Sequence, residues 1–76
     1  MAVFIPTHRH YKGENYQALG VALLVDSGGK MVTVYKNRHG DMFAREVGDF
    51  TAALPDGRRR FTPLSAAEAK AARAAE

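Results

Sequence analysis

The chain contains no cysteine and no tryptophan, and none of its apolar runs approaches the length of a membrane span. Without cysteine, neither a disulfide nor a thiolate metal site can stabilise the fold. A transmembrane helix needs about 20 apolar residues, far more than any run of this sequence supplies. The N-terminal residues lack the basic start and the longer apolar core of a signal peptide. We therefore expect a soluble, cytoplasmic protein.

Motifs for catalysis are missing as well. Ser27 and Ser65 fall in an expected hairpin loop and at an expected helix start, and the sequence has no cysteine nucleophile. No pair of carboxylates has a spacing suited to acid and base catalysis, and no glycine-rich phosphate loop precedes a helix. We expect no enzyme activity and no cofactor.

Size and charge set the next limits. With 76 residues, the chain is long enough for one domain and one small core. Lys and Arg exceed Asp and Glu by 11 to 8, which gives a net charge of +3. This balance favours an anionic partner but does not identify one.

Glycine and proline divide the chain into short apolar segments, which predicts a mainly β fold. The expected strands cover residues 3–5, 7–12, 16–25, 31–36, 42–47 and 58–61. The expected turns cover residues 13–15, 26–30, 37–41 and 55–57, and residues 50–54 form either a helical turn or a strand. Strands and turns of this spacing predict a small SH3-like antiparallel barrel or a curled sheet. This β unit spans residues 1–64.

The composition changes at residues 65–76, which are mostly alanine and charged residues. This segment predicts a C-terminal α-helix. Ser65 and Glu68 have the spacing of a capping box, which satisfies free amide donors at a helix start. Alanine has the highest helix propensity, but a helix of about ten residues is marginal unless it packs on the domain.

A set of motifs is spread over about residues 7–64. It consists of Arg9-His10-Tyr11-Lys12-Gly13, Tyr16, Leu19-Gly20, Ala22, Val32-Thr33-Val34-Tyr35, Gly40, Phe43-Ala44-Arg45, Phe50, Asp56-Gly57 and Arg60-Phe61. These motifs resemble those of a family of small bacterial proteins, the domain of unknown function 1653. The chain departs from the family pattern at Glu46, where the family has proline, and in the loop at residues 26–30. Because the family has no assigned activity, the resemblance implies no reaction.

The main candidate site is a polar cluster drawn from the motif regions. Its members are Arg9, His10, Lys12, Tyr16, Tyr35 and Arg45. In one interpretation the cations are solvated or paired and the tyrosines cover the edge of the core. In the other, the cations converge on an anion and a tyrosine stacks on a ring, as nucleotides and single-stranded RNA require.

Two weaker candidates remain. His8 and His10 would lie on one face of a strand and could hold a metal with His39 or Asp41, but this spacing is a weak pattern. The run of Arg58, Arg59 and Arg60 could contact phosphates, although alternation along a strand would separate Arg59 from the other two.

The sequence therefore predicts a non-catalytic binding module for a nucleotide, an oligonucleotide or another small anion. The alternative is a protein-interaction or self-associating module, for example a homodimer, without a small-molecule ligand. It rests on residues 16–25, where strand alternation places apolar side chains on both faces. Leu19, Val21 and Leu23 would share one face, and Tyr16, Ala18 and Leu24 the other.

Overall fold

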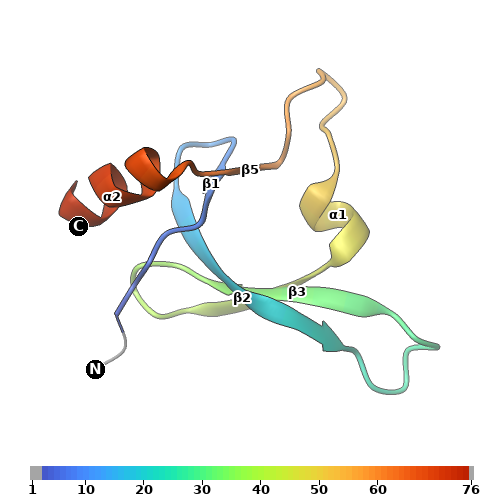
Figure 1. Cartoon of the computed structure of the whole chain (residues 1–76). Helices are drawn as coiled ribbons and strands as arrows, with labels where there is room; N and C mark the ends of the chain where they lie inside the picture. The colour runs from blue at the N-terminus through green and yellow to red at the C-terminus, as the bar shows by residue number, and fades with distance from the viewer. Residues whose placement is uncertain (1–2, 76) are drawn as a thin grey trace.

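A computed structural model describes residues 3–75 as one antiparallel sheet with two helices (Figure 1). The strands are β1 (His8–His10), β2 (Asn15–Leu23), β3 (Met31–Lys36), β4 (Met42–Glu46) and β5 (Phe61–Pro63). The helices are α1 (Val47–Thr51) and α2 (Ala66–Ala75). The mainly β fold with a C-terminal helix is therefore confirmed.

The sheet is open. Its strand order is β4-β3-β2-β1-β5, and among the described residues the two outer strands β4 and β5 form no ladder with each other. Of the two predicted architectures, the curled sheet is the one that forms. Figure 1 shows β2 running from the β1–β5 end of the molecule to the far end, where its hairpin with β3 projects.

Strand pairing assigns the side chains to two faces. Partners in neighbouring strands point to the same side, and residues two apart along a strand do so too. The pairs His8 with Tyr16, His10 with Phe61 and Thr33 with Arg45 therefore belong to one side, which we call the inner face. Helix α1 lies against this face, since its Phe50 ring lies 5.2 Å from His8.

A β-bulge in β2 changes the side on which the aliphatic residues lie. Ala18 pairs with Tyr35, but the register then shifts, and Val21 pairs with Thr33. Because Tyr35 and Thr33 share a face, Val21 lies on the same face as Ala18 and not opposite it. Simple alternation had predicted the reverse, which is wrong here because the extra residue, Leu19, inverts the pattern beyond it.

Two predicted strands do not form as expected. Residues 3–5 join no ladder of the sheet. The amide of Ile5 instead donates to the side-chain oxygen of Gln17 at 2.9 Å. Residues 58–60 turn back on residues 52–54 through Leu54 N to Arg58 O (2.6 Å) and Arg60 N to Ala52 O (3.1 Å). The last strand therefore begins only at Phe61.

Helix α2 begins with the predicted capping box. The Ser65 amide donates to Glu68 Oε1 and the Glu68 amide donates to Ser65 Oγ, both at 3.1 Å. Ala72 is buried on this helix, so one side of it packs against the rest of the chain. Across residues 3–75, neither helix has the length and apolar character needed to cross a membrane.

Candidate functional site

The inner face is built on a cluster of aromatic rings. Phe50 and Phe61 stack with ring centres 4.2 Å apart, and the Tyr35 ring lies 5.4 Å and 5.3 Å from them. Tyr16, which is half-buried, packs against this core from β2. Phe43 on β4 stacks on Tyr35 at 5.5 Å but remains 39% exposed. The cluster thus leaves an aromatic surface open to solvent at the β4 edge.

His10 occupies the junction between this cluster and the turn after β1. Its ring lies 5.0 Å from Phe61 and 4.4 Å from Tyr11. Its Nδ1 atom accepts a hydrogen bond from the Lys12 amide at 3.2 Å. Burial lowers the pKa of the imidazole below its usual value, and the charges of nearby Lys12, Arg45 and Arg60 lower it further, while Glu14 raises it. His10 is therefore neutral near pH 7 and lies in a positive potential.

Two of these neighbours are arginines with unsatisfied donors. The Nε atoms of Arg45 and Arg60 are buried and have no hydrogen-bond partner among the described residues. Buried guanidinium donors normally find acceptors, because leaving one unpaired costs about 1–3 kcal/mol. Arg45 belongs to β4 and Arg60 to the segment before β5, and both act on His10. The fold thus brings them near one histidine from opposite edges of the sheet.

Tyr16 connects the cations to an acid. Its hydroxyl donates to Glu14 Oε2 at 3.4 Å. Burial raises the pKa of this phenol, as do the charge and hydrogen bond of Glu14, whereas Arg45 lowers it. The tyrosine therefore stays protonated, and its one hydroxyl proton is directed to Glu14.

The predicted cluster is brought together in part. His10, Lys12, Tyr16, Tyr35 and Arg45 lie on or beside the inner face. Arg9 does not join them, because its strand partners Asn15 and Thr62 place it on the outer face. Its Nε atom donates there to Asn15 Oδ1 at 3.2 Å. The neighbouring residue on the strand, His10, points to the other side.

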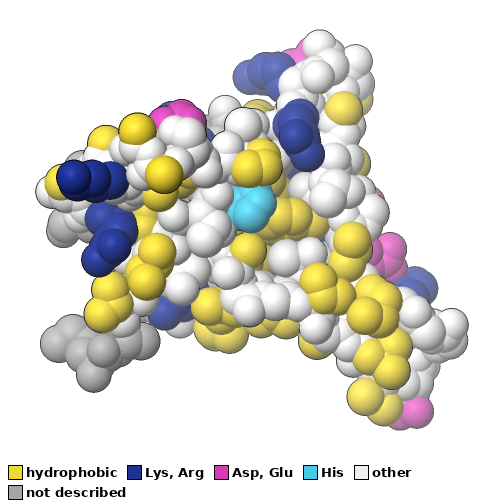
Figure 2. All heavy atoms as spheres, in the orientation of Figure 1, with side chains coloured by type: hydrophobic (Ala, Val, Ile, Leu, Met, Phe, Trp, Pro, Cys, Tyr) yellow, Lys and Arg dark blue, Asp and Glu magenta, His cyan; other side chains and the backbone are white. Residues whose placement is uncertain are grey.

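Two pockets of the described chain lie outside the aromatic cluster. A pocket of about 290 Å³ beside α2 is lined by Arg9, His10, Tyr11, Gly13, Thr62, Leu64 and Glu68. Its one cation, Arg9, is matched by its one acid, Glu68, so the charges of this pocket do not favour an anion. A pocket of about 280 Å³ between two turns is lined by residues 13–15 and 37–39, none of them in the predicted cluster. Figure 2 shows a histidine at the centre of the molecule among hydrophobic side chains, with Lys and Arg side chains toward the margin.

The polar cluster predicted from the sequence does not include Arg60. In the sequence this residue belongs to a run of three arginines that could contact phosphates and to the motif Arg60-Phe61, and the fold divides that run. Arg58 donates back to Asp56 Oδ2 at 2.7 Å, and the charge of Arg59 acts on His8. The position of Arg60 directly before Phe61, an aromatic residue of the core, was the available signal.

Among residues 3–75, no three His, Cys, Asp or Glu side chains are grouped so that they could hold a metal.

The histidines predict how stability depends on pH. Burial lowers the pKa of His8, as does nearby Arg59, and the pKa of His10 is lowered for the reasons given above. Both imidazoles bind protons more readily in the unfolded chain, so stability is complete above the unfolded pKa of about 6.5 and falls as the pH decreases through the lower folded values. We expect the melting temperature to fall between about pH 7.5 and about pH 5.5.

Thermal melts of the chain and of a His8→Gln, His10→Gln variant measure this effect. The variant should show a flatter dependence in that window. The two carboxyl groups whose pKa values are lowered, Asp56 and Glu68, contribute only at more acidic pH. A wild-type melting temperature that rises on acidification would contradict the assignment.

Comparison with known proteins places the chain in a family without a described function. No curated protein matches the chain, and no solved structure does. Residues 6–63, which hold all five strands and α1, match the family described as "Protein of unknown function (DUF1653)". Since the match spans most of the sequence, the chain belongs to the DUF1653 family.

Proposed function

We propose that this chain is a non-catalytic, cytoplasmic binding module whose inner face takes up a nucleotide, a single-stranded oligonucleotide or another small anion. One observation carries the proposal. Arg45 and Arg60 approach the same histidine and each holds a buried Nε donor without an acceptor in the described chain. A phosphate oxygen is an acceptor that matches a guanidinium in both charge and geometry.

The charges around His10 favour an anion over a neutral ligand. Three cations, Lys12, Arg45 and Arg60, depress its pKa, and Glu14 is the acid that opposes them. An anion bound among these groups would relieve their mutual repulsion. The same arrangement disfavours a cationic ligand.

The aromatic surface supplies the second part of nucleotide recognition. Phe43 is 39% exposed, and the half-buried Tyr16 lies 6.1 Å from it and 6.1 Å from His10. Bases stack on such rings with about 1–3 kcal/mol each, and they do so with little dependence on sequence. Stacking on Phe43 with the phosphate toward Arg45, two residues further along β4, would use both features at once.

Fluorescence anisotropy with a labelled single-stranded RNA tests the proposal, with ATP as a competitor. We expect the affinity for RNA to fall as the salt concentration rises. A plot of log association constant against log salt concentration should have a slope of about −0.7 for each phosphate contacted. Arg60→Ala should weaken binding at least about tenfold, since a charge-assisted hydrogen bond contributes about 1.5–3 kcal/mol. Displacement of the RNA by ATP would identify a nucleotide as a sufficient ligand.

The matched control is Arg73→Ala, which removes one positive charge from an exposed position in the last turn of α2. This variant should leave the affinity nearly unchanged. Equal weakening by Arg60→Ala and Arg73→Ala would reduce the effect to net charge. No binding of RNA or ATP at low salt would overturn the proposal.

A further inference from the structure

The outer end of the β2–β3 hairpin carries an uncovered apolar surface. Val21 and Leu23 are each 58% exposed and Met31 is 46% exposed. Leu23 and Met31 are strand partners, and Val21 lies two residues from Leu23, so all three share the inner side of the hairpin. We call them the hairpin patch. Figure 2 shows hydrophobic side chains along this projecting end, which Figure 1 places far from α2.

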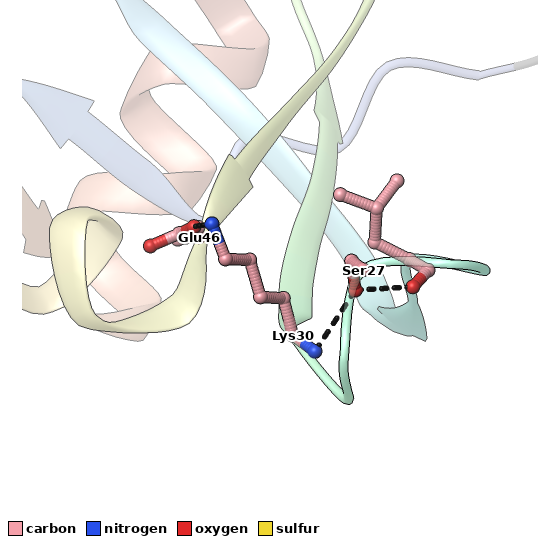
Figure 3. A network of polar contacts seen from close by, with 4 residues as sticks. Ser27, Lys30 and Glu46 are labelled. Atoms are coloured by element: carbon pink, nitrogen blue, oxygen red, sulfur yellow. Dashed lines mark hydrogen bonds and ion pairs between the residues drawn. The ribbon is translucent and has the colours of Figure 1, made fainter.

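Hydrogen bonds and an ion pair hold the hairpin that carries the patch. Its loop has Asp26, Gly28 and Gly29 at positive φ, and Ser27 Oγ donates to Leu24 O and accepts from the Lys30 amide at 3.0 Å. Lys30 Nζ also pairs with Glu46 Oε1 on β4 at 3.2 Å (Figure 3). The patch is therefore presented on an ordered hairpin, and its exposure does not come from a frayed end.

The chain exposes more surface than a compact protein of its size. The accessible surface is 5226 Å², whereas a compact monomer of this mass is expected to expose about 4600 Å². The principal extents of 41 × 37 × 18 Å describe a flat molecule. The excess of about 600 Å² approaches the roughly 800 Å² that each partner buries in a standard interface.

The charged residues near the patch indicate which kind of partner could cover it. The charged groups of the hairpin and of the adjacent part of β4 are Asp26, Lys30, Arg45 and Glu46, two of each sign. Arg45 lies on the face of the patch, opposite Thr33, and Glu46 lies on the other face, opposite Val32. A nucleic acid or an anionic membrane would require a surplus of basic residues around the patch, whereas the two cations here are matched by two acids. An apolar centre with both signs at its rim is complementary to itself under a two-fold rotation.

We propose that two copies of the chain pair through their hairpin patches, with Val21, Leu23 and Met31 of each copy packed against those of the other. The pairing buries apolar area that one chain cannot cover and uses the same residues on both sides. None of the three residues belongs to the charged group around His10, although Arg45 lies across Thr33 from Val21 on the same face.

Sedimentation velocity over a wide range of protein concentration tests the pairing. We expect a species of twice the 8.3 kDa chain mass that dissociates on dilution. Leu23→Lys should shift the protein to the single-chain mass, because it places two like charges in an apolar contact. The control Val3→Lys changes a residue that is 63% exposed and lies outside the hairpin, and it should leave the dimer intact. A monomer at every concentration, or a dimer that survives Leu23→Lys, would overturn the proposal.

A second measurement covers the case in which Leu23→Lys fails to fold. The chain has no cysteine, so a disulfide formed by a Leu23→Cys variant can only join the introduced cysteines of two copies. Across a two-fold axis, this residue should form a disulfide with its own copy under mild oxidation, whereas Lys70→Cys on α2 should not. Equal cross-linking of both variants, or none from Leu23→Cys, would count against the pairing.

Discussion

Replacing Phe61 with alanine should destabilise the fold more than any other single truncation considered for this chain. Phe61 is 2% exposed and its ring lies within 6 Å of those of Phe50, Tyr35, Tyr16 and His10. Removing a buried phenyl ring costs about 3–5 kcal/mol. At about 0.05–0.15 kcal/mol per residue, a chain of this size has only about 4–11 kcal/mol in total. The substitution thus removes about a quarter of the stability or more.

Urea unfolding followed by far-UV circular dichroism measures the loss. The matched control is Phe43→Ala, because Phe43 is the same residue type in the same ring cluster but is 39% exposed at an edge strand. It should cost well under half as much as Phe61→Ala, since less area is returned to water. Equal losses at the two positions would mean that the cluster around Phe61 is not the core.

Local chemistry made the turns and the capping box predictable. Asp26, Gly28 and Gly29 all have positive φ in the hairpin loop, a conformation that glycine adopts freely and aspartate tolerates. Ser65 and Glu68 bond reciprocally as their spacing implied. These features depend on residues within four positions of one another, so one sequence contains the information that determines them.

The errors involve pairing between distant segments. The bulge at Leu19 depends on how β2 meets β3, and alternation alone carries no sign of it. The late start of β5 follows from hydrogen bonds between residues 52–54 and residues 58–60, which use the backbone that was assigned to a strand. Both outcomes are decided by long-range geometry.

The candidate site shows the same division. Strand alternation places the side chains of Arg9 and His10 on opposite faces of β1, and the strand pairs agree. The predicted polar cluster nevertheless contains both residues. Arg45 and Arg60 are 15 positions apart in the sequence, and only the curl of the sheet brings both near His10. The sequence indicated which residue types matter, and the fold decided which of them meet.

Arg45→Met should separate the structural role of Arg45 from its role in binding. The arginine lies opposite buried Thr33 and two residues from Phe43, with its Nε atom buried and without a partner in residues 3–75. An unbranched apolar side chain would fill similar space without an unpaired donor. It would also remove one of the cations that repel each other around His10. We expect the free energy of unfolding to stay level or rise by up to about 1 kcal/mol.

Binding should respond in the opposite direction. If Arg45 donates to a phosphate, the methionine variant should bind single-stranded RNA or ATP at least about tenfold more weakly, in proportion to one charge-assisted contact. Lys36→Met is the control, because it makes the same kind of replacement on β3 at a position whose partners, Gln17 and Met42, lie on the outer face. It should leave the affinity nearly unchanged. A large loss of stability without any loss of binding would instead identify Arg45 as a structural cation, since a ligand site that needs its charge must weaken when that charge is removed.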